Sequence, residues 1–570
     1  MKQIVFCVLV IFGLSQSSFA QNIEDLKTAK PFSYSGAIAA HTGFYQANGI
    51  ANRSPRSIWG LSGNLNFVLF EKLNLPFSFT VGRYGNSTSY PTFGQIGISP
   101  NYKWVTLHLG YRNMNFSPYT LAGHTFLGVG IDLKPKKMLR LSAMYGRLRN
   151  AAEVDTTHSF VQPAFKRTGM GLKLGFGDDE HYIDLIFFKA KDDQNSLEIA
   201  QNKITPAENL VLGVSAQVAI FKIFRLKYDV GASIFTRDQN SQEVLSKNLA
   251  ANVNNFNDLG LIDLKASSRA NLAQKASLSF LRAKNFNAKV TYERIDPQYE
   301  TMGAYFFAND LERLTIAPSF QLFKNKVSLN GSYGLQRNNL LGDRAETTQK
   351  SIGSANLDIH PNATFGLNMN YSNYSIYQEA GRMELNDTVA FNLATTTISI
   401  TPRFNIQKEK VMHSIVLNAN YQKSNQDNDL FYGKSQNFES KLIGLNHSLI
   451  FLESQFSLNT GLNYQSFSVA GIETALTGGT IGLNLPFANN KLNLGLSGSL
   501  NARRLNKVSD GSTLSSYANL SYSPAKSHSF RLNFGWLKNF GTQASDFSEL
   551  RGGVSYTFVF APNPKNKVKK

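Results

Sequence analysis

The sequence predicts an all-β chain that forms a single large antiparallel, up-and-down transmembrane β-barrel of about 24 to 26 strands, most simply about 26. Three observations lead to this fold class. Apolar and small polar residues alternate with a period of two through nearly everything after residue 33, and the alternating runs are about 10 to 14 residues long. Soluble strands average about five or six residues, whereas a tilted membrane-spanning strand needs roughly 9 to 11. Very short links and long polar links also alternate along the chain.

The N-terminus has the features of a secretory signal peptide. Lys2 precedes an apolar run from Ile4 to Leu14, and Ser18-Phe19-Ala20 places small residues at the cleavage-site positions. We therefore expect residues 1–20 to be removed, leaving 21–32 as a short periplasmic segment, 33–560 as the barrel and 561–570 as a basic tail. The alternative is a buried N-terminal helix. Cys7, the only cysteine, is lost with the signal, so the mature chain has no thiol for a disulfide or a metal.

Each alternating segment has one apolar and one small polar face. The run from Lys491 to Ala502 shows this: Leu492, Leu494, Leu496 and Leu500 alternate with Asn493, Gly495, Ser497, Ser499 and Asn501. In hydrocarbon every backbone N–H and C=O must be paired, and a sheet achieves this only by closing on itself. The apolar faces then meet lipid and the polar faces line the lumen. The competing interpretation is a secreted β-solenoid or a set of sandwiches.

The links divide into two classes. Short turns are expected near 71–72, 100–101, 134–135, 177–178, 221–222, 284–285, 324–325, 360–361, 408–409, 453–454, 489–490 and 524–525. Longer polar stretches lie at 150–163, 192–207, 237–272, 297–310, 337–349, 377–390 and 424–437. This alternation is typical of outer-membrane barrels, which have tight periplasmic turns and longer external loops. An even strand number leaves both termini on the periplasmic side.

The last expected strand carries a recognisable pattern. Leu550, Val554, Tyr556, Phe558 and Phe560 share one face, and the strand stops at an aromatic residue. This resembles the C-terminal signature of Gram-negative outer-membrane β-barrel proteins of the porin-like or channel-like class, which the barrel-assembly machinery reads. The tail 561–570 departs from the pattern, because the aromatic is usually the last residue. The resemblance implies a location in the cell outer membrane, in contact with its lipids.

The sequence contains no recognisable catalytic or metal-binding motif. Zinc-hydrolase, nucleophile-elbow and phosphate-loop patterns are absent, and the nine histidines are scattered. We therefore assign no catalytic, cofactor-binding or metal-binding residues, expect no cofactor, and do not expect an enzyme. One alternative stays open: some outer-membrane barrels are lipid hydrolases with a Ser/His pair on the outer wall, and sequence alone does not pair residues across strands.

The basic residues of this chain are expected to face the barrel lumen and not to bind nucleic acid. The formal net charge is +19, but an exported chain is a poor candidate for binding nucleic acid. Alternation places nine cations on the lumen side: Arg112, Arg140, Lys173, Arg225, Lys227, Lys289, Arg313, Arg403 and Arg531. The acids on that side are Asp132, Asp184, Asp229, Glu293 and Asp358. This excess would favour anions in an open pore, whereas mutual pairing across strands is the simpler explanation for most of these charges. From about Leu442 onward the lumen face is mostly uncharged.

Two functions fit this architecture. The first is an outer-membrane pore for small polar or anionic solutes, with the lumen narrowed by in-folded loops. The second is a non-enzymatic accessory or structural barrel of a secretion, protein-assembly or lipid-export complex, whose partners would be other outer-membrane or periplasmic proteins. An empty barrel of this size would leak. Stretch 237–272, which has near-helical spacing at Val244, Leu245, Leu249 and Val253, is a hypothetical plug or an external loop.

Overall fold

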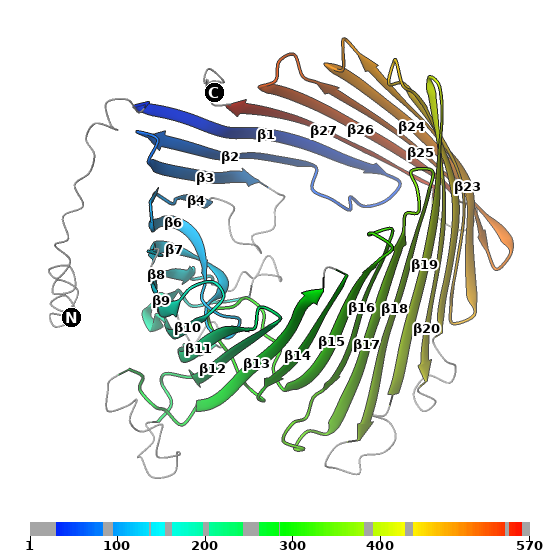
Figure 1. Cartoon of the computed structure of the whole chain (residues 1–570). Coiled ribbons are helices and arrows are strands. Elements are labelled where there is room, and N and C mark those ends of the chain that lie inside the picture. The colour runs from blue at the N-terminus through cyan, green and yellow to red at the C-terminus, as the bar shows by residue number, and fades with distance from the viewer. Residues whose placement is uncertain are drawn as a thin grey trace.

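The computed structural model shows a closed β-barrel (Figure 1). It describes residues 30–83, 95–135, 138–153, 162–197, 204–242, 261–283, 285–380, 391–427, 437–541 and 546–560. The strands are β1 (Phe32–Asn48), β2 (Ser57–Leu69), β3 (Leu73–Arg83), β4 (Gln95–Ile98), β5 (Asn101–Tyr102), β6 (Val105–Asn115), β7 (Ala122–Leu133), β8 (Leu139–Arg149), β9 (Arg167–Gly177), β10 (Tyr182–Asp192), β11 (Glu208–Ile220), β12 (Phe224–Thr236), β13 (Ser268–Ala283), β14 (Phe286–Ile295), β15 (Leu311–Leu322), β16 (Val327–Arg337), β17 (Glu346–Ile359), β18 (Phe365–Ala380), β19 (Phe391–Lys408), β20 (Val411–Asp427), β21 (Phe438–Phe451), β22 (Ser457–Val469), β23 (Ile472–Phe487), β24 (Leu492–Leu505), β25 (Val508–Tyr522), β26 (His528–Gly541) and β27 (Phe547–Phe560). A single 3₁₀ turn, Gln194–Ser196, is the only helical element among the described residues.

The predicted strand number is confirmed. The sheet has 27 strand segments, but β4 and β5 both pair with β3 on one side and β6 on the other, so together they occupy one place and the barrel has 26. Consecutive strands pair antiparallel, and β1 pairs with β27 to close the ring. Gly36 lies opposite Phe560, so the chain enters and leaves the barrel at the same rim. The strands thus run up and down in turn, and an even strand number brings both ends of the barrel to one rim.

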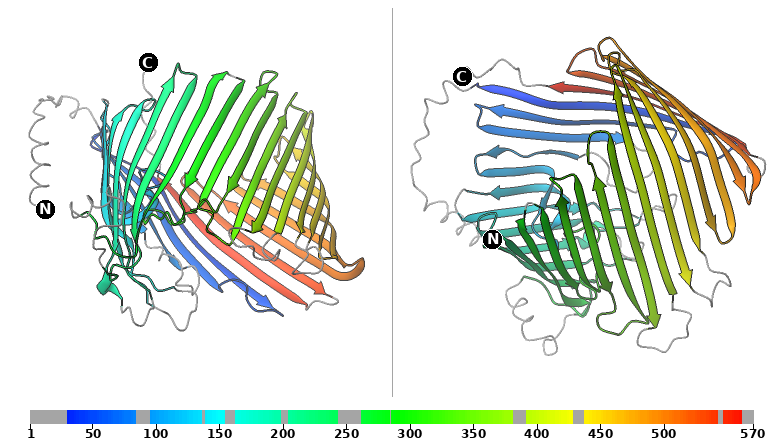
Figure 2. Two further views of the ribbon diagram at one scale, coloured as in Figure 1. Left: turned by 90° about the horizontal axis from the view of Figure 1, so that it is seen from below. Right: turned by 45° about the vertical axis from the view of Figure 1, so that its right-hand side comes forward.

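Most predicted links lie where expected. Eleven of the twelve short turns fall between the expected strands and form one rim of the barrel, here called the short-turn rim. The twelfth is wrong: residues 100–101 lie at the interruption between β4 and β5, and the turn follows at 103–104. On the opposite rim, links 470–471 and 506–507 are also very short. The long links of this rim are therefore concentrated between β3 and β21. The two views of Figure 2 show the long strands that follow, coloured orange to red.

The outer face of the wall is apolar. Leu417, Leu445 and Leu462 lie next to one another on neighbouring strands and are each exposed. Aromatic rings form contacts along the short-turn rim, for example between Phe224 and Phe280 and between Phe286 and Phe320. An apolar band bordered by aromatic rings matches the membrane-facing surface of a transmembrane barrel. No helix among the described residues is long and apolar enough to cross a bilayer.

The predicted terminal segments lie largely outside the described residues. This holds for residues 1–20, for 21–29 of the segment 21–32, and for the tail 561–570. The signal peptide and the basic tail therefore stay predictions. Strand β1 begins at Phe32, close to the predicted start of alternation at residue 33.

Candidate functional site in the barrel interior

Two connections fold inward and cover part of the inner wall. Residues 116–121 join β6 to β7, and residues 296–310 join β14 to β15; we call these two segments the inner layer. Leu172 and Leu174 of β9 are exposed on the outer face, whereas Lys173 of the opposite face lies over the ring of Phe116, so Phe116 lies inside the barrel. Figure 1 shows the connections of the cyan and green strands bending inside the ring.

The inner layer rests on a buried apolar cluster. Phe116 and Leu121 from the first segment and Met302 from the second are fully or almost fully buried against inward side chains of the wall, such as Met144 and Phe188. A second cluster joins Tyr119, Ile295, Tyr299 and Leu311. These contacts remove large apolar side chains from water, which is the main favourable contribution to holding a segment in place.

Hydrogen bonds tie the two segments to each other. Tyr299 Oη donates to the Tyr119 carbonyl at 2.6 Å, and Thr301 Oγ1 donates to the Thr120 carbonyl at 2.8 Å. The Ala122 N–H donates to the Gly303 carbonyl at 2.9 Å. Other bonds join the inner layer to the wall: the Met302 N–H donates to Asn209 Oδ1 at 3.0 Å, and Ser233 Oγ of β12 donates to the Glu300 carbonyl at 2.6 Å. The two segments therefore form one structural unit, although they are about 180 residues apart in the sequence.

Glycines in the wall provide the space for the inner layer. A Cβ added at Gly171 would lie 2.7 Å from the Phe116 ring, and one added at Gly231 would lie 2.7 Å from Tyr299 Oη and 2.8 Å from Tyr119 Cβ. Real Cβ atoms do not approach other atoms this closely, so a side chain at Gly171 would displace Phe116, and one at Gly231 would displace Tyr119 and Tyr299. The small residues of the inner face thus shape a recess.

We expect Gly231→Val to loosen the inner layer. The new side chain overlaps Tyr119 and Tyr299, and overpacking of this kind typically costs about 1–3 kcal/mol. Amide hydrogen exchange of residues 299–303 should become faster, measured by mass spectrometry in detergent. The control is Gly444→Val on the inner face of β21, where the nearest atom is 3.8 Å from the added Cβ. Equal exchange in both variants would contradict the assigned recess.

Ion pairs lie under and beside the inner layer. Glu293 accepts a hydrogen bond from Tyr119 Oη at 2.8 Å and also binds Arg313, while Lys275 lies 3.9 Å away. Burial and the neighbouring Glu293 carboxylate raise the pKa of Tyr119 far above its usual value, so the phenol stays protonated and keeps donating. Burial likewise raises the pKa of Tyr299. These two phenols therefore stay protonated, and keep donating, across the range of pH in which proteins are normally handled.

The nine cations assigned to the lumen divide into two groups. Five have partners: Arg140 binds Asp184 at 2.7 Å, Lys227 binds Asp229 at 3.2 Å, and Arg313 binds Glu293. Arg112 donates to Ser78 Oγ at 2.6 Å, and Lys173 donates to the Asn115 carbonyl at 3.4 Å and lies over the Phe116 ring. Of the five acids assigned to that side, Asp132 and Asp358 bind His108 and His360 respectively.

The remaining four cations have no ion-pair partner among the described residues. They are Arg225 of β12, Lys289 of β14, Arg403 of β19 and Arg531 of β26. Each lies within about five residues of the strand end at the short-turn rim, by the strand bounds. The alternation had placed them on one face, and each lies within six residues of a predicted short turn, so their position at one mouth could be predicted; their lack of an ion-pair partner among the described residues could not.

The hypothesis that stretch 237–272 plugs the lumen is not supported by its described residues. Ile262 and Leu264 are buried against Leu210 and Ile234. On β11, Leu210 lies two residues from the outward Leu212, and on β12, Ile234 lies four residues from the outward Val230. Both side chains therefore point outward, and residues 262 and 264 cover the outside of the wall. The helix-like spacing at 244–253 falls on residues outside the described ones. The length of the stretch and this spacing had suggested a plug, whereas the segments that enter the lumen, 116–121 and 296–310, are shorter.

A Ser–His–Asp row lies on the inner face. Ser99 Oγ is 3.1 Å from His108 Nδ1, and His108 Nε2 is 3.0 Å from Asp132 Oδ2. Acyl transfer also needs donors for the developing oxyanion. The Ser99 N–H already donates to the Pro76 carbonyl, and the next residue, Pro100, has no N–H. These hydrogen bonds therefore join neighbouring strands of the wall next to the interruption between β4 and β5. We assign no hydrolase activity to these three residues.

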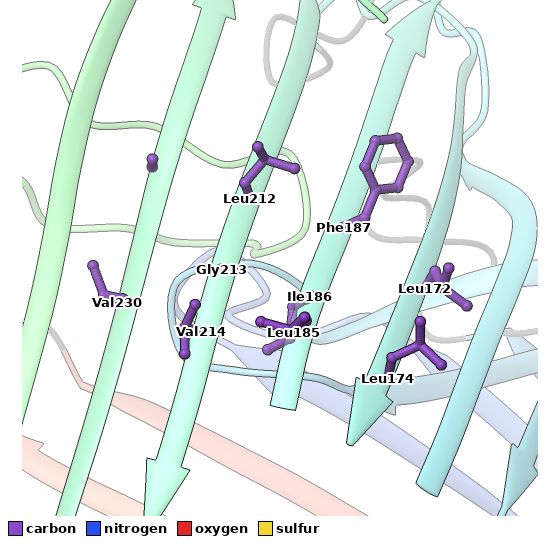
Figure 3. Close-up of a pocket in the computed structure, with 10 residues that line it drawn as sticks. Leu172, Leu174, Leu185, Ile186, Phe187, Leu212, Gly213, Val214 and Val230 are labelled. Carbon is purple, nitrogen blue, oxygen red and sulfur yellow. The ribbon is translucent and has the colours of Figure 1, made fainter. Parts of the chain in front are cut away.

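Shallow hollows mark both faces of the wall: one is lined by inward polar residues such as Asn330, Ser354 and Asn370, and others lie on the outer face. Figure 3 shows one of about 460 Å³ between β9 and β12, lined by outward side chains such as Leu172, Leu185, Leu212 and Val214. Such furrows are what an apolar surface presents to lipid chains. Among the described residues, no group of three or more His, Cys, Asp or Glu side chains is placed to hold a metal ion.

No family model matches this sequence, and no curated protein matches it. Among solved structures, the chain is similar to the P pilus usher (PapC) translocation pore, with 10% identity, a TM-score of 0.40 and coverage of 93% of this chain and 99% of the usher chain. It is also similar to Acinetobacter baumannii OccAB2, with 10% identity, a TM-score of 0.32 and coverage of 93% and 98%. It is similar as well to Pseudomonas aeruginosa OccK9 (OpdG), with 13% identity, a TM-score of 0.30 and coverage of 66% of this chain and 97% of the OccK9 chain. Such low scores carry no argument about function. The fold itself, a closed barrel with an apolar outer wall, confirms the expected class of outer-membrane β-barrel proteins.

Proposed function

We propose that this protein is an outer-membrane pore for small polar solutes, with a preference for anions, and that the inner layer narrows its lumen. The apolar outer band and the aromatic rings at the short-turn rim support insertion in a bilayer. The expected signal peptide and the C-terminal pattern support the outer membrane as its location. Membrane lipids are then its first partners, and no catalytic step or cofactor is involved.

The observation that carries the anion preference is a set of four cations at one mouth that have no ion-pair partner within the part of the chain that the structure describes. Arg225, Lys289, Arg403 and Arg531 come from strands spread around the ring, so they act on any solute that passes this rim. Cations on the wall of a pore raise the local concentration of anions and lower that of cations. The paired cations contribute less, because Asp184, Asp229 and Glu293 balance their charge.

Ion selectivity in planar bilayers tests this proposal. We expect the reversal potential under a KCl gradient to show preference for chloride over potassium. Replacing the four unpaired cations together by glutamine should move the reversal potential towards potassium. Exchanging Arg and Lys at the same four positions keeps the charge and should leave the selectivity unchanged. A wild-type channel that prefers potassium would contradict the proposal.

Purification in mild detergent separates the pore from the accessory-barrel alternative. A lone conducting species supports the pore. Partners that co-purify at fixed stoichiometry with a non-conducting barrel would replace the pore by a component of a larger export or assembly complex.

A further inference from the structure

Two histidines meet on the outer, lipid-facing side of the wall. His413 Nδ1 of β20 lies 3.1 Å from His447 Nε2 of β21, and the two rings are stacked with centroids 5.4 Å apart. His447 lies two residues from the outward Leu445, and His413 lies four residues from the outward Leu417. Side chains two or four residues apart on a strand share a face. Both imidazoles therefore point away from the lumen and towards the bilayer.

This histidine pair lies among the aromatic rings near the short-turn rim. Phe404 of β19 is opposite Ile415, which is in turn opposite His447, and the Phe404 ring contacts Phe365 with centroids 5.1 Å apart. Girdles of aromatic residues mark the interfaces of a transmembrane barrel, and its tight turns face the periplasm. His413, the third residue of β20, is close to the same rim. The pair therefore lies at the level of the lipid headgroups of the periplasmic leaflet.

A cation lies next to the pair. Lys408, the last residue of β19, alternates in phase with Phe404 and Ile406, which are both exposed on the outer face. Ile406 is opposite His413 and Lys408 is opposite Val411, so Lys408 is the diagonal neighbour of His413 towards the rim. In the neutral pair, the imidazole that accepts the shared hydrogen bond carries its own proton on its other nitrogen, which can donate to a ligand. An ammonium group and an imidazole N–H together suit an oxyanion.

An apolar furrow of about 670 Å³ begins at His447 and crosses the outer wall to β25. Leu462 and Leu500 lie on either side of Gly479, and Gly498 takes an outward position in the next row of paired residues. A Cβ added at Gly479 would meet no atom closer than 3.5 Å, and one added at Gly498 none closer than 3.8 Å. The two glycines therefore form an open floor between leucine side chains, and such a furrow suits a flexible hydrocarbon chain.

We propose that Lys408, the histidine pair and the adjoining furrow bind one phospholipid of the periplasmic leaflet. The lipid phosphate accepts a hydrogen bond from the pair and faces the Lys408 ammonium group, and one acyl chain lies in the furrow. Imidazoles at a lipid-facing wall lose free energy unless a polar partner replaces water, and the phosphate is such a partner. The site goes beyond the proposed pore, because it requires insertion in a membrane but not conduction.

Native mass spectrometry of the whole protein, released from detergent, tests the site by counting bound lipids. The probe is palmitoyl-oleoyl phosphatidylglycerol; diacylglycerol with the same chains lacks the phosphate, and glycerol phosphate lacks the chains. We expect one phosphatidylglycerol to bind more tightly than diacylglycerol, and glycerol phosphate not to bind.

Two variants divide the site into its polar and apolar parts. His413→Gln combined with His447→Gln should weaken phosphatidylglycerol by about tenfold, as for loss of a hydrogen bond to a charged group, and leave diacylglycerol unchanged. Gly498→Leu fills the furrow and should weaken both lipids.

The matched controls are His528→Gln and Gly353→Leu. His528 is also outward near the short-turn rim, two residues from the exposed Phe530, but its Nδ1 is paired with Tyr556 Oη at 2.8 Å. Gly353 lies opposite the exposed Tyr333, with no atom closer than 3.5 Å to an added Cβ. Both variants should bind lipid like the wild type, and heat-dependent mobility on SDS gels confirms that each variant is folded.

Three outcomes overturn the site. They are equal binding of phosphatidylglycerol by the wild type and the double histidine variant, equal binding of phosphatidylglycerol and diacylglycerol by the wild type, and binding of glycerol phosphate as tight as that of the lipid. The last result would indicate a site for free phosphate esters. The proposed pore fails separately, by lack of chloride conduction, so the two failures are distinguishable.

Discussion

Removing the tip of the inner layer is expected to raise the single-channel conductance severalfold. The change replaces residues 298–308 by a short Gly-Ser linker. This deletes Tyr299, Met302 and Phe307, which fill space inside the wall. It also deletes the Tyr299 and Thr301 hydroxyl groups, which donate to the Tyr119 and Thr120 carbonyls of residues 116–121. Ions then meet a wider aqueous path, because the wall itself keeps its 26 paired strands. The measurement is single-channel current in planar bilayers at symmetrical KCl.

The control shortens another connection of the same rim, residues 50–55 between β1 and β2, which contributes to neither apolar cluster of the inner layer. Its conductance should stay at the wild-type value. If both variants conduct like the wild type, the inner layer does not narrow the path. If the first variant fails to fold, Gly231→Val gives the milder test of the same layer.

A charge on the outer wall is expected to destabilise the barrel strongly. Leu445 lies in the middle of β21, is 45% exposed, and neighbours Leu417 and Leu462 on the outer face. Leu445→Arg places a guanidinium against hydrocarbon, which costs about 2–4 kcal/mol near the bilayer midplane. We expect the midpoint of urea unfolding in lipid vesicles to fall, as followed by tryptophan fluorescence.

Asn446→Arg is the matched control, one residue further along the same strand and on the opposite face. Asn446 is exposed on the polar side, where an added cation meets water. This variant should unfold at the wild-type urea concentration. A larger loss for Asn446→Arg than for Leu445→Arg would show that the two faces have been assigned the wrong way round.

The alternation could be read from the sequence because it is local. Leu492, Leu494 and Leu496 alternate with Asn493, Gly495 and Ser497 within one strand, and the period of two needs no knowledge of the partner strand. Short turns were equally clear, since few residues separate two alternating runs. The turn placed at 100–101 was wrong because an interruption inside a strand position looks like a turn: β4 and β5 each pair with β3 and β6 around it.

The inner layer could not be predicted in the same way. Phe116, Tyr119 and Leu121 form an apolar group inside a link, which was a usable signal, and Tyr305, Phe306 and Phe307 are three successive aromatic residues in another. Nothing local says that the two groups meet. Their contact needs wall glycines such as Gly171 and Gly231 on strands that come between them in the sequence.

The sequence by itself determined the closed antiparallel wall, its strand number and which face of each strand is apolar, because period-two side-chain alternation and backbone pairing are set within and between neighbouring segments. Only the tertiary structure decided which connections enter the lumen, that 261–264 lies outside, and which lumen cations have no ion-pair partner among the described residues. Those features depend on contacts between residues distant in the sequence, whose free energy exists only once the barrel has closed.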